Sequence, residues 1–497
     1  MPGTDTSYQL TRFAFLRGLG LIYFVAFLSL AQQWQPLIGS NGLLPAGAFL
    51  TQVQHHFDSF AAGFWRLPSV FWFGASDRLL GACAWLGVGL SVLVVVGWAN
   101  APLLAGLWLL YLSFVHIGQI FYGYGWESLL CETGFLSIFL APALSPKPFA
   151  GSVPWPVLVL LRWLCFRVMF GAGLIKLRGD GCWTDLSCLD YHYETQPLPN
   201  PLSAFFHHLP ASVHRAGVLF NHFVELLVPF GVFGPKGLRR VAGALIIAFQ
   251  LCLILSGNLS FLNWLTIVIA QACFDDQMLA RLLPPRWRAR NCTPAEPLSR
   301  ARRIVLGVLC TLIGCLSLEP IANLLSPRQR MNAGFDPFGL VNTYGAFGSV
   351  TRARNEIVLE GTTASTIDQN TRWLAFELPC KPGDLQRRPC FVAPYQYKLD
   401  WQMWFAAFGS AGREPWLMHL VYKLLRGDPV VDPLFAVQPF RGHAPRYVRA
   451  RFYRYRFADS GVPGVYWQRQ LLGDYLRPLS LDDPAFLAYL EARGFTE

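Results

Sequence analysis

The chain has 497 residues and a formal net charge of +11; 53% of its residues are hydrophobic and only 14% are charged. Soluble proteins carry about 25% charged residues, so this composition excludes one large soluble globule, a disordered chain and a small disulfide-stapled domain. Residues 1–325 contain 34 charged residues, whereas the much shorter 326–497 contains 37. This contrast predicts a polytopic helical membrane domain over 1–325 and a soluble domain over 326–497.

Nine apolar runs have about the 20 residues that a helix needs to cross a bilayer, or nearly so. They are residues 13–31, 79–98, 101–121, 127–143, 154–177, 218–234, 238–256, 259–274 and 302–320. The run at 127–143 is the weakest, because it is short and contains Glu127 and Glu132. The first run lacks a small-residue cleavage site, so we expect about nine spans that begin with an uncleaved helix.

Arginine and lysine set the expected orientation. They collect in the connections at 235–240 and 275–303, which the positive-inside rule assigns to the cytoplasm. With nine spans and a cytoplasmic N-terminus, the loops 32–78 and 178–217 and the whole C-terminal domain lie outside the cytoplasm. Membrane lipids are then expected partners, and nucleic acid is not.

Four cysteines form two close pairs in the segments expected outside, Cys182 with Cys188 and Cys380 with Cys390. Disulfides form in oxidising compartments, so we predict both bonds. The other eight lie in spans or in the arginine-rich loop, where a buried thiol acts as a small apolar filler.

Strand signals dominate the C-terminal domain. Short β-branched and aromatic runs cover 356–380, 391–405 and 446–457, whereas helical patterns are confined to about 413–426 and 484–493. We predict a β-rich domain that packs against the membrane domain, because it begins directly after a span.

The most unusual segment is AGLIKLRGDGCWTDLSCLDYHYETQPLPNP, residues 172–201. Lys176 ends the fifth span, and a polar and aromatic loop follows it. The candidate pocket or client-binding residues of this loop are Asp180, Trp183, Asp185, Tyr191, His192 and Glu194. The lysine either reaches the membrane interface as an ordinary flanking charge, or it lies in a partly desolvated pocket as a base or anion anchor.

Other polar groups lie inside predicted spans, where they have an energetic cost and tend to face the interior of the bundle. His116, His222 and Glu225 are candidates for the same pocket as Lys176, and His222 and Glu225 lie three residues apart on one helix face. The competing interpretation pairs Glu225 with Arg162 or Arg167 as a structural contact. The neighbouring histidine pairs are not spaced as ligands on one helix face, so no metal site is expected.

An aromatic cluster, YQYKLDWQMWFAAFG, lies in the C-terminal domain. It contains Tyr395, Asp400, Trp401 and Trp404. Core packing is the favoured role, and a face that binds a peptide or an acyl chain is the alternative. A P-loop, a GxSxG elbow, an HExxH motif and a GxGxxG motif are all absent from the sequence.

The chain resembles the lipase maturation factor family of multispan membrane proteins. The segments that carry the resemblance are SNGLLP (40–45), GYGWESLLCETGFL (123–136), the Lys176 loop, FNHFVELLVPFG (220–231), NTYGAFGSVTRARNEIVLEGT (342–362) and LDWQMWFAA (399–407). The resemblance implies a factor that assists folding and assembly of exported lipases. The chain ends in Gly-Phe-Thr-Glu, without an endoplasmic reticulum retrieval signal, and arginine far outnumbers lysine. We therefore expect a bacterial inner-membrane protein with a periplasmic C-terminal domain.

A shorter segment, GLIKLRGDGCW, is similar to a stretch of the vitamin K-dependent carboxylases and their bacterial relatives. That similarity implies a catalytic base at Lys176. Two hypotheses therefore stand beside each other, with a transporter ranked behind both. The first is an assembly factor that needs no cofactor and holds an exported client. The second is a membrane enzyme acting on a lipid, quinone or peptide, with Lys176, His116 and Glu225 as its catalytic residues.

Overall fold

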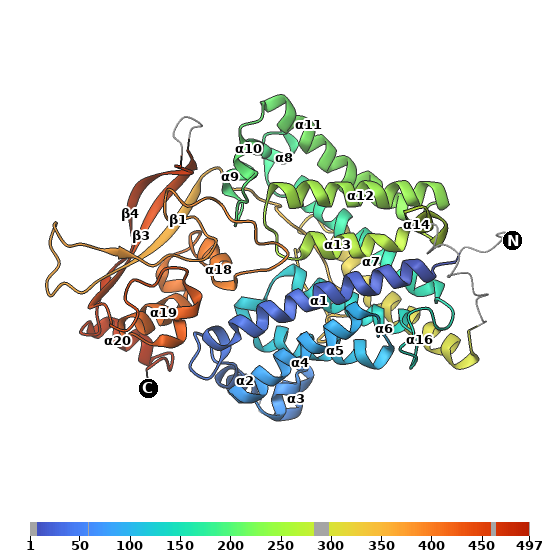
Figure 1. Cartoon of the computed structure of the whole chain (residues 1–497), viewed down its shortest axis with the longest axis horizontal. Helices are drawn as coiled ribbons and strands as arrows, with labels where there is room; N and C mark the ends of the chain where they lie inside the picture. Colours follow the sequence, from blue (N-terminus) through green and yellow to red (C-terminus); the bar gives the residue numbers. More distant parts are fainter. Residues whose placement is uncertain (1–6, 58, 283–297, 459–463, 497) are drawn as a thin grey trace.

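A computed structural model describes residues 7–57, 59–282, 298–458 and 464–496. A bundle of helices occupies one end of the molecule, and a small sheet with its own helices occupies the other (Figure 1). Helix α1 (Gln9–Ile38) begins at the end of the bundle that is farthest from the sheet, and α1, α12 (Lys236–Ser256) and α13 (Leu262–Ala270) run lengthwise between the two ends.

The described helices of the first region include at least one in each predicted apolar run, and shorter helices also form outside those runs, most of them inside the predicted loops 32–78 and 178–217. They are α1 (Gln9–Ile38), α2 (Ala46–His56), α3 (Phe60–Arg66), α4 (Asp77–Val96), α5 (Ala101–Ile117), α6 (Gly125–Leu140), α7 (Trp155–Arg178), α8 (Gly181–Thr184), α9 (Leu189–Thr195), α10 (Ser203–His207), α11 (Ala211–His222), α12 (Lys236–Ser256), α13 (Leu262–Ala270), α14 (Asp276–Leu282), α16 (Arg300–Leu316) and α17 (Leu318–Leu325). A π-helical turn, Phe223–Leu227, and a short 3-10 segment, Val228–Phe233, continue α11.

Six helical segments among the described residues are long and apolar enough to cross a membrane. They are Gln9–Ile38, Asp77–Val96, Trp155–Arg178, Ala211–Phe233, Lys236–Ser256 and Arg300–Leu325. The predicted runs at 101–121, 127–143 and 259–274 form the shorter helices α5, α6 and α13. The count of nine spans therefore stays a prediction.

Local sequence explains how α4 begins, ends and packs. The Ser76 side chain accepts a hydrogen bond from the Leu79 amide at the N-terminus of the helix, and Gly97, with φ of 131°, ends it. The face of α4 that packs on α1 includes Gly87, where an added Cβ would lie 2.3 Å from the Phe27 ring. The opposite face exposes Val92 and Val96, as expected of a helix that faces lipid.

The C-terminal region contains a four-stranded antiparallel sheet in the order β2-β1-β3-β4. Its elements are β1 (Arg354–Thr362), β2 (Leu374–Ala375), α18 (Lys398–Ala406), α19 (Pro415–Leu425), β3 (Tyr447–Phe457), β4 (Trp467–Leu479) and α20 (Pro484–Glu491). Arg354 pairs with Tyr455 and Thr362 with Tyr447, so the whole of β1 is paired with β3.

The sequence prediction for this region is right for β1, β3, α19 and α20, and it is wrong for 391–405. That segment ends in α18, whose consecutive residues Leu399 to Met403 are all buried. A short helix with such a run of buried residues shows neither the alternation of a half-buried strand nor one apolar stripe. Strand β4 was missed, because its residues from Gln468 to Leu472 are exposed and mostly polar.

The sheet region is joined to the helical bundle by buried polar contacts. Glu127 of α6 forms an ion pair with Lys398 of α18, and both side chains are enclosed. The Trp126 indole donates to Glu127, and so does the Tyr111 hydroxyl. Glu132, further along α6, pairs with Arg167 and accepts a 2.7 Å hydrogen bond from Tyr344. The two acids that weakened the predicted run at 127–143 are therefore partners of cations from other elements.

The two loops expected on the side of the C-terminal domain contact it. The Asp180 amide donates to the Gly348 carbonyl at 2.9 Å. The Trp404 indole donates to the Thr195 carbonyl at 3.2 Å, and His419 Nδ1 lies 2.8 Å from the Leu43 carbonyl oxygen. Packing of the C-terminal domain on the membrane domain is therefore confirmed.

Candidate functional site

Lys176 lies near the end of α7 and is 3% exposed. Its Nζ is 2.6 Å from each carboxylate oxygen of Glu225 and 3.3 Å from Asn221 Oδ1. Asn221 Nδ2 in turn donates to Glu225 at 3.1 Å, and the Trp183 ring centroid lies 5.1 Å from the ammonium. Lys176 and Glu225 therefore form a buried ion pair with Asn221 and Trp183 as neighbours.

The backbone explains how Glu225 reaches this lysine. Glu225 belongs to the π-helical turn Phe223–Leu227, which continues α11 and packs against α7. A π turn inserts one residue into the helical repeat, so it changes which side chains face a neighbouring helix. Pairing of Glu225 with Arg162 or Arg167 is therefore wrong: Arg162 donates to the Ala272 carbonyl, and Arg167 pairs with Glu132.

His116 and His222 do not join the ion pair. His116 Nδ1 lies 2.8 Å from the Pro68 carbonyl oxygen, and His222 Nε2 lies 2.9 Å from the Trp183 carbonyl oxygen. A general base must be within hydrogen-bond reach of the proton that it removes, whereas the buried Lys176 Nζ already contacts both Glu225 oxygens and Asn221. The arrangement therefore suits a structural ion pair better than a catalytic base.

The polar residues of the loop after Lys176 mostly contact the C-terminal domain or cap local turns. Asp180 accepts from the Cys182 amide at 3.1 Å, and Asp185 accepts from the Ser187 amide at 3.0 Å. The Tyr191 ring lies 5.9 Å from the guanidinium of Arg352. None of these three side chains is bonded to Lys176 in the described part of the chain.

His192 and Glu194 lie at the contact between this loop and the sheet region. The His192 ring packs edge-on against Phe347 with 4.8 Å between centroids, and burial, with a smaller effect of Lys176, lowers its pKa to about 4. Glu194 accepts from the Phe457 amide at 2.8 Å, and burial raises its pKa. Both side chains therefore belong to an interface between the two regions.

Both predicted disulfides are present. Cys182–Cys188 closes the turn that contains Trp183, and it packs in a small apolar cluster with Val350 of the C-terminal region. Cys380–Cys390 closes the segment directly before Phe391. The apolar filler role is retained by Cys131, Cys165 and Cys273, which are free and buried, whereas Cys252 and Cys315 are exposed. Cys292 lies outside the described residues.

The residues of the aromatic cluster lie in different environments. Trp401 is buried and contacts Trp126 with 4.8 Å between ring centroids, as core packing predicts. Trp404 is half-buried and packs on Phe405 and Phe408, both of which are exposed. Tyr395 and Asp400 line a cavity instead.

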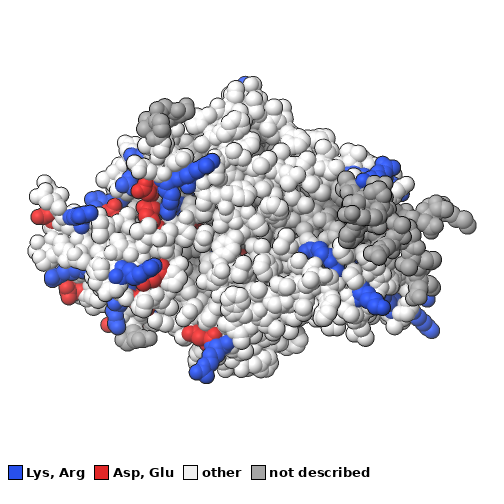
Figure 2. All heavy atoms as spheres, in the orientation of Figure 1, with Lys and Arg blue, Asp and Glu red and all other residues white. Residues whose placement is uncertain are grey.

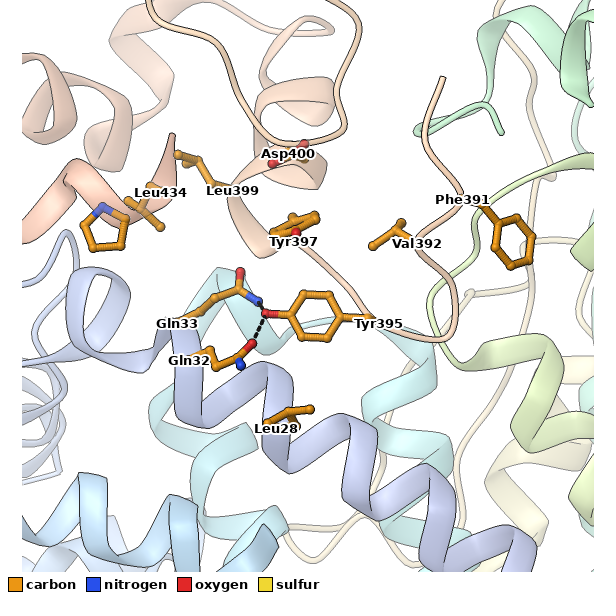
Figure 3. A pocket seen from close by; sticks show the side chains of 11 residues that line it. Leu28, Gln32, Gln33, Phe391, Val392, Tyr395, Tyr397, Leu399, Asp400 and Leu434 are labelled. Atoms are coloured by element: carbon orange, nitrogen blue, oxygen red, sulfur yellow. Dashed lines mark hydrogen bonds between the residues drawn. The ribbon is translucent and has the colours of Figure 1, made fainter. Parts of the chain in front are cut away.

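This cavity, of about 490 Å³, lies where α1 meets the C-terminal region (Figure 3). Its lining is Leu28, Gln32, Gln33, Phe391, Val392, Tyr395, Tyr397, Leu399, Asp400, Pro433 and Leu434. The Tyr395 hydroxyl accepts from Gln33 at 3.1 Å and donates to Gln32 at 2.9 Å. Phe391, at the edge of the lining, is 58% exposed. The cavity thus has largely apolar walls, a tyrosine held in place by two glutamines, and an exposed phenylalanine at its edge.

Asp400 is the acidic member of the lining. Its Oδ1 accepts from the amides of Cys380 and Lys381, each at 2.7 Å, while its buried Oδ2 has no hydrogen-bond partner in the described ranges. Burial raises the pKa of Asp400 to about 6. The sequence analysis did not predict that α1 lines this cavity. The available signal was the pair of neighbouring polar residues Gln32 and Gln33 at the end of an apolar run.

Donor sets for a metal ion are not found among the described residues, because no three His, Cys, Asp or Glu side chains converge there. The polar residues that line the cavity are two glutamines, two tyrosines and one aspartate. Such a lining, with few polar groups in an apolar wall, is typical of sites that bind an organic group or a peptide side chain.

Comparisons with known proteins agree with this architecture. The profile described as "Lipase maturation factor transmembrane domain" matches residues 10–281, and the one described as "Lipase maturation factor C-terminal domain" matches residues 340–477. The chain is 47% identical to lipase maturation factor 1 of Bos taurus over 96% of its length and 90% of that protein. It is 44% identical to lipase maturation factor 1 of Homo sapiens over 98% and 91%, and 30% identical to human lipase maturation factor 2 over 98% and 85%. No solved structure matches. With both domains matched and nearly the whole length covered, the chain belongs to the lipase maturation factor family.

Proposed function

We propose that this protein is a membrane-embedded maturation factor that binds an exported client, such as a lipase, on the side of the C-terminal domain. The proposal is supported by 44–47% identity to lipase maturation factor 1 proteins over nearly the whole chain. Holding a client requires a preformed surface, and no cofactor takes part in it. The enzyme alternative is not favoured, since Lys176 is paired with Glu225.

The cavity between α1 and the C-terminal region is the proposed client-binding site. Its walls are held by contacts that join the two regions, above all Gln33, which accepts from the Lys398 amide and donates to the Gln396 carbonyl. A preformed site loses little conformational entropy on binding. The exposed Phe391 would pack on an apolar side chain of a partly folded client. Tyr395, hydrogen-bonded to Gln32 and Gln33, would form part of the cavity wall that this side chain meets.

The proposed orientation has the C-terminal domain outside the cytoplasm. In Figure 2 lysine and arginine gather at both ends of the visible face, and a broad middle zone carries almost no charge. Acidic residues accompany the basic ones only toward the end with the sheet. A basic end opposite the sheet region favours a cytoplasmic N-terminus, and two disulfides favour an oxidising compartment for the other end. A bacterial inner membrane, with a periplasmic C-terminal domain, is the proposed location.

The binding-site proposal can be tested at Phe391. A photoreactive phenylalanine analogue at position 391 should crosslink to a secreted lipase expressed with the full-length protein in its native host. Phe391→Asp should reduce the crosslinked or co-purified lipase at least about tenfold, as expected for an aromatic anchor, and should lower the specific activity of the secreted lipase.

Phe408→Asp is the matched control, because Phe408 is 51% exposed in the same region but does not line the cavity. It should leave lipase maturation unchanged. Full lipase activity with Phe391→Asp at normal membrane levels would refute the binding site. A reporter fused after residue 497 that is active only in the cytoplasm would refute the orientation.

A further inference from the structure

Three arginines converge at the end of the helical bundle that is farthest from the sheet. Arg12 of α1 donates to the Ala150 carbonyl at 2.9 Å, and Arg302 of α16 donates to the Ala141 carbonyl at 2.9 Å. Both acceptors belong to the connection between α6 and α7. Arg17 lies beside the same connection, because a Cβ added to Gly97 would lie 3.2 Å from Arg17 Nη2 and 3.7 Å from Pro148 Cγ.

These guanidinium groups have many unused hydrogen-bond donors. Arg12 is fully buried, and its Nε and Nη1 have no hydrogen-bond partner among the described residues. All three guanidinium nitrogens of Arg17 are likewise buried and without a hydrogen-bond partner there. A buried donor that lacks an acceptor is costly, more so when it is charged. Such a group is expected to meet an acceptor that the polypeptide does not supply.

The local charge points to an anion. Arg17 and Arg302 both repel Arg12, and the acid that attracts Arg12 is Asp276. The two Asp276 oxygens already accept from the Ser7 hydroxyl at 2.6 Å and from the amides of Gln9, Leu10 and Thr11 at the start of α1. The cluster therefore keeps an excess of positive charge.

The surroundings of Arg17 fix how an anion would approach. Its guanidinium carbon lies 4.2 Å from the Phe13 ring centroid, and Phe13 stacks on Phe149. Stacking occupies a face of the planar group and leaves the in-plane N–H donors for a ligand. A planar fork of N–H donors matches the paired oxygens of a phosphate.

We propose that the cluster of Arg12, Arg17 and Arg302 binds the phosphate group of an anionic membrane lipid. The cluster lies on α1 and α16, both of which belong to candidate membrane spans, near the end of each helix. Basic side chains gather at this end of the molecule (Figure 2). Basic sites between membrane helices bind lipid headgroups at this level of the bilayer, and the phenylalanine pair lies where an acyl chain would leave the headgroup.

The test uses the full-length protein, delipidated in a neutral detergent. Native mass spectrometry and thermal unfolding are recorded with phosphatidylglycerol, with phosphatidylcholine and with inorganic phosphate. We expect phosphatidylglycerol to remain bound and to raise the melting temperature, while the other two have little effect. Equal stabilisation by phosphatidylcholine would show that the site does not select an anionic lipid. Full stabilisation by inorganic phosphate alone would show that the ligand is a free phosphate and not a lipid. These comparisons in the unmodified protein decide the proposal even where a variant folds poorly.

Variants then locate the site. Arg17→Gln and Arg302→Gln should each weaken phosphatidylglycerol binding about tenfold, as loss of a charge-assisted hydrogen bond predicts. Arg303→Gln removes the same charge from the next residue, which is exposed, and should bind as the unmodified protein does. An equal loss in Arg303→Gln would show that general surface charge, and not the cluster, holds the lipid.

Discussion

The Lys176–Glu225 pair gives the most decisive prediction. Lys176→Met keeps most of the apolar stem but leaves the Glu225 carboxylate buried, at 3% exposure, with Asn221 as its remaining hydrogen-bond donor. Removing one partner of a buried ion pair costs roughly 3–5 kcal/mol. The Asn221 amide offsets part of this, so we expect a loss of about 3 kcal/mol.

Glu225→Leu should cost a similar amount, because it leaves the ammonium buried beside Asn221 and the Trp183 ring. The double variant Lys176→Met/Glu225→Leu removes both charges and fills their volume with apolar atoms. Replacement of a complete buried pair is close to neutral, so the double variant should lose about 1 kcal/mol or less. It should therefore be more stable than either single variant.

The assay is the fraction of monodisperse protein that remains after heating in detergent, measured by size-exclusion chromatography for the four forms of the cycle. Lys147→Met is the control, since Lys147 is exposed in the connection between α6 and α7. A Lys176→Met protein as stable as the unmodified one, or a double variant less stable than both singles, would refute the structural role. Unchanged stability with lost client maturation would instead support a functional pocket at Lys176.

Three further predictions concern the C-terminal region. Lys398→Met leaves Glu127 buried without its cation, so limited proteolysis should release the sheet region faster, whereas a rate equal to that of the unmodified protein would contradict the domain-joining role. Burial raises the pKa of Asp400 to about 6 from the 3.8 of a solvent-exposed aspartate, so the stability that it contributes is fully present below pH 3.8 and is lost as the pH rises through 6. The free energy of unfolding should fall by about 3 kcal/mol across this window relative to Asp400→Asn, and parallel pH profiles would contradict the assignment. Replacing Cys380 and Cys390 with serine should cost about 2–3 kcal/mol on the chain-entropy estimate, and intact-mass measurement after alkylation, with and without reduction, checks that the bond is present.

The sequence alone identified the features that depend on composition and short spacing. Apolar runs predict helices wherever they occur, because a bilayer requires the backbone to satisfy its own hydrogen bonds. The close cysteine pairs predicted both disulfides, since few residues separate the partners. The strand patterns at β1 and β3 were also readable, because β1 contains neighbouring β-branched residues and β3 is rich in aromatic ones.

Only the tertiary structure decided which charges meet. The cost of burying Glu127, Lys176 or Glu225 can be recognised in the sequence, but that cost is relieved by whichever cation or acid the packing brings near. Lys398, the partner of Glu127, lies 271 residues away in another domain, and a π turn directs Glu225 to Lys176 and away from the arginines of α7. The cavity depends on the same packing, since Gln32 and Gln33 of the first helix meet Tyr395 only when the C-terminal region folds back onto α1. The sequence therefore shows which charged residues lie in apolar runs and need a partner, and only the packing of the helices shows which residue that partner is.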